Sequence, residues 1–342
     1  MPDHAIEARR LARSFVAGEQ KVEAVRGVEF TVRTGEIFGF LGPNGAGKTT
    51  TMRMLGTLLR PDSGSATVAG HDLLADPAAV RRDIGYVAQQ GGADPSATVR
   101  QELVLQSRLN RLSKQEAAAR AEELSRIFDL TELLDRPGAT LSGGQRRRLE
   151  IALGLVHRPK LLFLDEPTAG LDPPSRALLW QQIRRLRDEA GLTLFLTTHY
   201  LDEADSLCDR VLILDKGRVV AEDTPESLKA KVAGDIVTVR VSGNAEEARA
   251  ALAAQRGVHQ LTLTGTTLRF SAAHDEAIIP KIVRALDAVG VDPTFVEVTR
   301  PTLDDVFMAV TGERPAEPAE PDGPAADDHQ PTARVASGAV PE

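Results

Sequence analysis

Four short apolar runs lie within the first 220 residues, and turn residues bound each of them. They are GEIFGFLG (35–42), PKLLFLDEP (159–167), LTLFLTTH (192–199) and DRVLILDKG (209–217). Their apolar residues are continuous rather than alternating, which is typical of strands buried on both faces. Helical patterns separate the runs, such as PSRALLWQQIRRLRDEAG (174–191), which ends at a glycine suited to a helix C-terminus. This alternation predicts an α/β domain with a mostly parallel sheet.

The strand pattern stops between about residues 95 and 158. The segment QELVLQSRLNRLSKQEAAARAEELSRIFDL indicates helices with charged outer faces. We therefore expect a helical subdomain at about 95–158, inserted into an α/β domain that spans residues 1–232.

A second pattern begins near residue 233. Alternating strands at 235–243, 259–271 (two strands around Gly265) and 294–299 are interspersed with helices at 245–255, 275–289 and 303–312. The order βαββαβ predicts a small ferredoxin-like α+β domain over residues 233–312. Residues 313–342 are rich in Pro, Ala and acids, and this composition predicts a disordered tail.

Length and charge narrow the class of protein. A chain of 342 residues favours two domains. The net charge of −8 argues against a nucleic-acid-binding protein, which would show a basic face. The single cysteine, Cys208, excludes an internal disulfide framework and is expected to be a small buried residue.

The N-terminus lacks the apolar core of a signal peptide, and no apolar run approaches the ~18 residues needed to span a bilayer. We expect a cytoplasmic protein, and any membrane part must come from another chain.

The segment GPNGAGKTT matches the phosphate-loop pattern G-x-x-x-x-G-K-[ST]. Glycines let backbone N–H groups converge on phosphate oxygens, Lys48 adds a cation, and Thr49 offers a hydroxyl to Mg²⁺. A predicted strand precedes the loop and a helix follows, so a phosphate would face a helix N-terminus. An ordinary glycine-rich turn is the alternative. The predicted phosphate site comprises Gly42, Pro43, Asn44, Gly45, Ala46, Gly47, Lys48, Thr49 and Thr50.

Polar residues end two of the predicted strands. LLFLDEP ends at Asp165 and Glu166, and buried carboxylates must be paired or bind a metal. Asp165 is the expected Mg²⁺ ligand, and Glu166 is placed to polarise a water that attacks a γ-phosphate. Without a phosphate loop in the same sheet, a helix cap would be the simpler interpretation. His199 ends another strand; a structural role is the alternative, but ligands bind at this edge of open α/β sheets.

LSGGQRRRL (141–149) indicates a second anion-binding device. Ser142 followed by Gln145 predicts a capping box at the start of a helix. Free N–H groups at this helix start, with Gly143 and Gly144 permitting close approach, could hold an anion. A plain helix cap is the alternative, and the arginines at 146–148 are expected to form a solvated or ion-paired face.

Together, the motifs GPNGAGKTT, LSGGQ, LLFLDEP, GLD (170–172) and TTHYLDEAD (197–205) resemble the ATP-binding subunits of ABC transporters over about residues 5–230. The resemblance implies a P-loop NTPase fold of ABC type that binds ATP and Mg²⁺. It makes residues 42–49 the Walker A loop, with Lys48 among the catalytic residues. It makes Asp165 the Walker B aspartate, Glu166 the catalytic glutamate and His199 the switch histidine.

The resemblance also assigns less specific positions. Gln89 in IGYVAQQ would be the Q-loop glutamine that touches Mg²⁺ and the attacking water, although Ala88 replaces a common proline and Gln90 is the neighbouring candidate. Phe15 would be the aromatic residue that stacks on adenine, with a core position as the alternative. Residues 169–172 would form the D-loop, ending at Asp172, with Ala169 in place of the commoner serine.

The family's assembly explains the second anion site. In ABC subunits the signature, here Ser142, Gly143, Gly144 and Gln145, closes over ATP held by an opposing subunit. The resemblance therefore implies a head-to-tail dimer, which we expect to be a homodimer, although a partner cassette from another chain is the alternative. RPTLDDVFMAVTG (300–312) resembles the ending of the daunorubicin/doxorubicin-resistance branch. That branch implies a separate multi-helix permease, export of a hydrophobic small molecule that binds the permease, and a location on the inner face of the cell membrane.

Two other functions remain as alternatives. One is a soluble ABC protein acting on ribosomes or DNA, which the single cassette and the acidic balance disfavour. The other is a non-hydrolysing regulatory subunit, which the intact Lys48, Asp165, Glu166 and His199 disfavour. The sequence does not identify the transported substrate.

Overall fold

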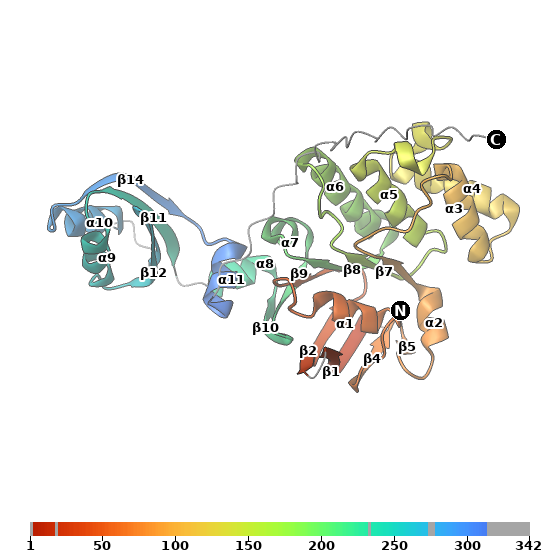
Figure 1. Cartoon of the computed structure of the whole chain (residues 1–342), viewed down its shortest axis with the longest axis horizontal. Helices are drawn as coiled ribbons and strands as arrows, with labels where there is room; N and C mark the ends of the chain where they lie inside the picture. Colours follow the sequence, from red (N-terminus) through yellow and green to blue (C-terminus); the bar gives the residue numbers. More distant parts are fainter. Residues whose placement is uncertain (1–2, 18–19, 232–233, 273–277, 313–342) are drawn as a thin grey trace, which may run out of the picture.

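A six-stranded sheet forms the centre of the first 230 residues (Figure 1). The computed structural model describes residues 3–17, 20–231, 234–272 and 278–312. The sheet has the order β10-β9-β3-β8-β7-β6, and all neighbouring strands are parallel except β9 and β10. Its strands are β3 (Ile37–Leu41), β6 (Ile84–Val87), β7 (Leu161–Asp165), β8 (Thr193–Thr198), β9 (Arg210–Asp215) and β10 (Arg218–Asp223). The predicted mostly parallel sheet is confirmed.

The continuous apolar runs have a direct structural cause, because the central strands are covered on both faces. Phe38, Phe163 and Phe195 point into one core, which β1, β2, β4 and α1 complete. The alternate residues Ile37 and Leu194 point into a second core, which they share with α3 to α7. Each strand therefore needs apolar residues at successive positions.

A second sheet lies against the first core, and the sequence analysis did not identify it. It has the order β2-β1-β4-β5 and is antiparallel. Its strands are β1 (His4–Ala17), β2 (Gln20–Arg33), β4 (Ser63–Val68) and β5 (His71–Asp72). One face of β1 and β2 is buried and the other carries charges, so their mixed sequence shows no continuous apolar run.

Helices cover the opposite face of the central sheet (Figure 1). The segment predicted to be helical contains α3 (Val99–Leu109), α4 (Lys114–Ile127) and α5 (Gly143–Gly154), and each of the three begins with a capping box. Short 3₁₀ turns at 131–133 and 138–140 connect α4 to α5. The remaining helices before residue 232 are α1 (Lys48–Leu55), α2 (Pro77–Asp83), α6 (Pro173–Ala190), α7 (Leu201–Leu207) and α8 (Pro225–Lys231).

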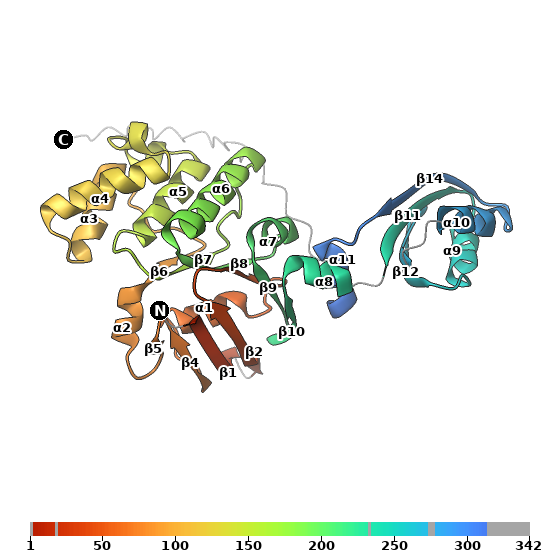
Figure 2. The ribbon, with the colours of Figure 1, turned by 180° about the vertical axis from the view of Figure 1, so that it is seen from behind.

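The C-terminal part has the predicted ferredoxin-like arrangement. Its antiparallel sheet has the order β12-β13-β11-β14. The elements are β11 (Asp235–Ser242), α9 (Ala245–Ala253), β12 (Val258–Thr264), β13 (Thr267–Ala272), α10 (Ile278–Asp287), β14 (Asp292–Thr299) and α11 (Leu303–Thr311). The last helix, α11, leaves this sheet and packs beside α7 and α8 (Figure 2). The predicted disordered tail at 313–342 lies outside the described residues.

Two further sequence expectations concern single features. Cys208 is buried, as predicted. Within the described residues, no helix combines the length and the hydrophobicity that crossing a membrane requires.

Candidate nucleotide-binding and catalytic site

The phosphate loop connects β3 to α1, and its path depends on glycine. Gly47 has φ +104°, and a Cβ atom added there would lie 2.4 Å from the main-chain oxygen of Ala24 on β2. A Cβ atom at Gly42 would lie 2.3 Å from the main-chain oxygen of Leu214. Neither position admits a side chain, so β2 and β9 can close tightly around the loop.

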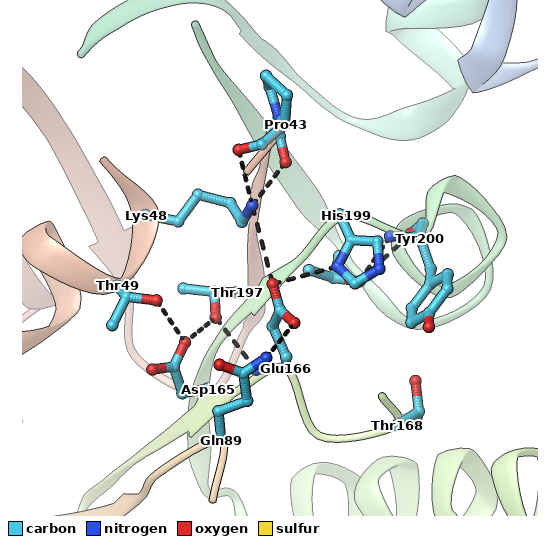
Figure 3. A network of polar contacts seen from close by, with 12 residues as sticks. Pro43, Lys48, Thr49, Gln89, Asp165, Glu166, Thr168, Thr197, His199 and Tyr200 are labelled. Atoms are coloured by element: carbon cyan, nitrogen blue, oxygen red, sulfur yellow. Dashed lines mark hydrogen bonds and ion pairs between the residues drawn. The ribbon is translucent and has the colours of Figure 1, made fainter. Parts of the chain in front are cut away.

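Lys48 begins α1 and is only 5% exposed. Its ammonium donates hydrogen bonds to the main-chain oxygens of Gly42 (2.6 Å) and Pro43 (3.1 Å), and it lies 3.9 Å from Oε1 of Glu166 (Figure 3). Burial lowers the pKa of Lys48, while the carboxylates of Glu166 and Asp165 oppose this effect. The loop thus folds around a cation, which a phosphate would neutralise better than two carbonyl oxygens do.

Asp165 ends β7 and accepts two hydrogen bonds on one oxygen. Thr49 donates to its Oδ1 at 3.0 Å, and Thr197 of β8 donates to the same atom at 2.6 Å (Figure 3). Parallel pairing of β7 with β8 brings Asp165 opposite Thr197. A carboxylate beside a hydroxyl suits Mg²⁺, which binds few protein oxygens and completes its shell with water and phosphate. Among the described residues, no group of three or more His, Cys, Asp or Glu side chains is arranged to hold a metal ion.

Glu166 follows Asp165 in a left-handed conformation with φ +44°. Its main-chain N–H donates to Thr197 Oγ1 at 3.1 Å, which turns the buried carboxylate toward the phosphate loop. Burial alone would raise the pKa of Glu166, but His199 and Lys48 outweigh it, so the pKa lies below its usual value. The carboxylate is therefore ionised at neutral pH.

Gln89 and His199 both reach this carboxylate, from opposite sides of the site (Figure 3). Gln89, just after β6, donates from Nε2 to Oε2 of Glu166 at 2.8 Å. Nδ1 of His199 lies 3.1 Å from Oε1 of Glu166, as a close ion-pair contact rather than an aligned hydrogen bond. The sequence named Lys48, Gln89, Asp165, Glu166 and His199 separately, and the structure brings all five together.

Arg147 is more buried than the sequence predicts. The sequence predicts a solvated or ion-paired face for residues 146–148, yet Arg147 is only 6% exposed. Its guanidinium donates to the main-chain oxygens of Pro167 (2.9 Å), Asp165 (2.8 Å) and Ala88 (2.7 Å), and it pairs with Glu150 at 3.0 Å. The fixed fork of an arginine suits several carbonyls at once. No sequence signal separated it from Arg146 and Arg148.

The signature turn begins α5. Ser142 and Gln145 form the predicted capping box: Gln145 N donates to Ser142 Oγ at 3.3 Å, and Ser142 N donates to Gln145 Oε1 at 3.0 Å. Ser142 and Gly143 are exposed, whereas Gly144 is buried against Ser175, where an added Cβ would lie 2.7 Å from Oγ. Within the described residues, no polar contact joins this turn to the chain's own phosphate loop.

Asp172, the expected D-loop aspartate, lies close to this turn. Asp172 caps α6 and accepts hydrogen bonds from the main chain and the hydroxyl of Ser175, both at 2.8 Å. Asp172 and the signature turn therefore share Ser175 as a neighbour, and Ser142, Gly143 and Asp172 are exposed.

Phe15 lies apart from the catalytic network, on β1. Its ring is 39% exposed, and the guanidinium of Arg13 lies 5.2 Å from the ring centroid. It pairs with Val22 of β2, two residues from Ala24, whose carbonyl contacts the phosphate loop. An exposed aromatic ring near this loop can stack on a base.

Glu203 is a buried carboxyl that the sequence analysis did not single out. Its Oε1 accepts hydrogen bonds from Thr168 (2.8 Å) and from the indole of Trp180 (3.2 Å), a residue given no polar role from its sequence. Burial raises the pKa of Glu203. Thr168 immediately precedes residues 169–172, and Glu203 lies on α7, four residues after His199. The hydrogen bond between them therefore links the segment 169–172 to the segment that carries His199.

Known proteins resemble the chain in sequence. Residues 25–169 match the ABC transporter family model, and residues 224–311 match the C-terminal domain of DrrA1-3-like ATP-binding proteins. The daunorubicin resistance ATP-binding protein DrrA3 of Streptomyces coeruleorubidus is 44% identical over 92% of this chain and 98% of its own length. The chain belongs to the ABC transporter family of ATP-binding proteins. A doxorubicin resistance ATP-binding protein DrrA of Mycobacterium tuberculosis is 42% identical over 90% of this ABC ATPase and 94% of its own length.

Solved structures agree with this membership. A dimeric ATP-binding cassette in a post-hydrolysis state with ADP and Pi has a TM-score of 0.59, is 28% identical, and covers 64% of this chain and 98% of its own. The cbiO1 subunit of the Clostridium perfringens cbiONQ transporter has a TM-score of 0.61 at 30% identity, covering 67% of this chain and 92% of its own. The predicted ABC-type fold is confirmed, and this ABC ATPase binds and hydrolyses ATP.

Proposed function

We propose that this ABC ATPase powers the export of a hydrophobic, drug-like small molecule through a separate membrane permease. The observation that supports this mechanism is that the signature turn and the phosphate loop of one chain are separate from each other. Lys48, Gln89 and His199 all contact the ionised Glu166, whereas the signature turn at Ser142 and Gly143 is exposed and has no polar contact with this phosphate loop. The turn is thus free to serve a phosphate held by a second copy.

Hydrolysis would use the carboxylate of Glu166 as the general base. It is ionised at neutral pH and can accept a proton from a water that attacks the γ-phosphate. Gln89 and His199 hold this carboxylate from two sides and orient it. Lys48 supplies a positive charge to the phosphates. Asp165, Thr49 and Gln89 would hold Mg²⁺, which when bound neutralises charge on the phosphate oxygens.

ATP would be enclosed between two copies packed head to tail. Each copy offers residues 42–50 to one nucleotide and Ser142, Gly143, Gly144 and Gln145 to the other. Asp172 lies beside the signature turn through Ser175, so it would lie at the same interface. Phe15 would stack on the adenine. Closure of the dimer on ATP and its release after hydrolysis would supply the movement.

Two observations support a transport role. Two relatives that are similar over nearly the whole chain are named for daunorubicin and doxorubicin resistance. The described helices include none that could cross a membrane, so the permease would be another chain. The protein would then lie on the cytoplasmic face of the membrane, held there by that permease, which would also bind the substrate.

Replacement of Glu166 by Gln tests the mechanism. The amide keeps the shape of the side chain but cannot accept the proton, so ATP should persist between two copies. We expect an ATP-dependent dimer by size-exclusion chromatography with light scattering, and no dimer with ADP. Glu226→Gln on the exposed start of α8 is the control and should behave as the wild type. A Glu166→Gln variant that stays monomeric at saturating ATP would refute the dimer mechanism.

Fractionation tests the transport role. The chain should join the membrane fraction only when a permease encoded beside its gene is co-expressed. ATP-dependent efflux of daunorubicin should then require both chains. Binding to ribosomes or DNA without a permease would favour the soluble alternative instead.

A further inference from the structure

Helix α11 belongs to the C-terminal unit but buries its apolar face in the ATPase core (Figures 1 and 2). Leu303, Val306 and Phe307 are each at most 3% exposed, and they share a core with Leu201 of α7 and Leu228 of α8. The end of the chain is thus an integral part of the packing around α7.

A small cavity shows how far this helix reaches. The cavity has a volume of about 20 Å³, and its lining comprises Phe307, Leu201, His199 and the segment Leu41–Asn44 at the start of the phosphate loop. Such a volume holds about one water molecule, so the walls lie close together. Phe307 is the one lining residue that comes from outside the ATPase domain.

The position of α7 determines where His199 lies. His199 and Tyr200 immediately precede Leu201, the first residue of α7, so a shift of this helix moves the histidine with it. Nδ1 of His199 is 3.1 Å from Glu166, a contact that a displacement of 1 Å would break. The aromatic ring of Phe307 supports α7 at the end that carries the histidine.

The other side of α11 is fixed to the C-terminal sheet. Asp305 is buried, and it accepts a hydrogen bond from Arg269 of β13 at 2.8 Å and from the hydroxyl of Thr302 at 2.8 Å. Charge-assisted bonds to a buried carboxylate have strict geometry. The helix therefore holds Phe307 in one place.

We propose that Phe307 is a positioning residue for ATP hydrolysis, which acts by holding His199 in its place beside Glu166. This inference rests on the proposed role of His199 toward Glu166. A purely structural core residue would contribute stability without this specific effect, and the two roles predict different kinetics.

The test compares Phe307→Ala with Phe307→Leu and Val306→Ala in the full-length chain. Val306 is buried on the same helix but does not line the cavity with His199. We expect Phe307→Ala to lower kcat at least about fivefold while the Kd for ATP changes less than about twofold, because misplacement affects reaction more than binding. Phe307→Leu, which refills most of the space, should recover at least about half of the rate, and Val306→Ala should keep nearly all of it.

A double-mutant cycle shows whether the effect passes through His199. In a single-turnover assay, Phe307→Ala should change the rate of a His199→Ala protein by less than about 1.5-fold, because its target is already absent. An equal fold-loss in both backgrounds would overturn the proposal, as would an unchanged kcat or an equal loss in Val306→Ala. If Phe307→Ala does not fold, the same comparison is made with Phe307→Leu. Should His199→Ala alone leave hydrolysis unchanged, the proposed role of His199 would fail, whatever Phe307 does.

Discussion

The guanidinium of Arg147 donates a hydrogen bond of 2.8 Å to the main-chain oxygen of Asp165. The same side chain reaches the main-chain oxygen of Ala88, one residue before Gln89. Helix α5, which begins with the signature turn, is therefore bonded to the two segments that carry Asp165, Glu166 and Gln89, the residues that we propose act in catalysis. A contact made at the turn by an opposing subunit would reach the catalytic site of this chain through one side chain.

Replacement of Arg147 by Ala should damage both stability and catalysis. It leaves several buried carbonyl oxygens without donors, and we expect the free energy of unfolding to fall by about 3 kcal/mol. We also expect kcat to fall at least about tenfold, since the chain around Glu166 loses its support. Urea denaturation and an ATPase assay measure the two effects. The control is Arg146→Ala: Arg146 is exposed and makes one bond of 3.3 Å to Gly138, so its change should be within about 0.5 kcal/mol. Equal behaviour of the two variants would contradict this prediction.

Lys48→Ala should abolish ATP hydrolysis. The substitution removes the buried cation of the phosphate loop, which lies 3.9 Å from Oε1 of Glu166. The measurement is phosphate release at saturating ATP. Lys160→Ala, at a lysine whose side chain is 59% exposed and paired with Asp83, should retain wild-type turnover. Turnover that survives in Lys48→Ala would show that the phosphate loop has been assigned wrongly.

Substitutions at the two adjacent glycines of the signature, Gly143 and Gly144, should have different effects. One should weaken dimerisation and the other should lower stability. At Gly143 an added Cβ meets no atom within 4 Å, so Gly143→Ala should leave the free energy of unfolding within about 0.5 kcal/mol. It should nevertheless weaken ATP-dependent dimerisation at least about tenfold, because the methyl group would stand between the turn and a phosphate of the second copy. Gly144→Ala should instead lower the free energy of unfolding by about 1–3 kcal/mol, since its Cβ would lie 2.9 Å from the Cβ of Ser175. Denaturation and light scattering in the Glu166→Gln background distinguish these outcomes, and normal dimerisation of Gly143→Ala would count against a contact at this turn.

Glu203 should give the stability of the wild type a specific pH dependence. Its pKa in the folded protein is raised above the ordinary 4.5, so the folded state binds the proton more tightly than the unfolded state. This contribution is fully present below pH 4.5 and is lost as the pH rises through the raised pKa. Glu203→Gln mimics the protonated form, so the wild type should lose stability relative to it as the pH rises across this window. Glu203→Ala should be less stable than Glu203→Gln by about 2 kcal/mol or more, because Thr168 and Trp180 lose their acceptor. A stability difference between the wild type and Glu203→Gln that is constant with pH would show that the pKa of Glu203 is the same in the folded and unfolded protein, and would contradict this prediction.

Local sequence determined much of the fold because buried parallel strands and capped helices have signals within a few residues. The runs around Phe38, Phe163 and Phe195 are apolar throughout since each strand is covered on both faces. The capping box at Ser142 needs only Gln145, three residues away. The sheet of β1, β2, β4 and β5 had no such signal, because its strands have one charged face and because β4 pairs with β1 across 51 to 62 positions of sequence, from Ala12–Ser63 to Ile6–Val68.

The candidate site divides in the same way. The expected Walker A, Walker B and signature residues lie in short motifs, and each motif predicts its chemistry from sequence. A phosphate and its metal need glycines, a lysine and carboxylates at fixed spacing. Arg147, Glu203 and Phe307 could not be distinguished from surface, helix-face or core residues, because their roles come from partners 18 to more than 100 positions away. Sequence alone identified the groups that we propose bind and hydrolyse ATP. Only the tertiary structure decided which buried side chains hold those groups together, because burial and long-range contact depend on the packing of the whole chain.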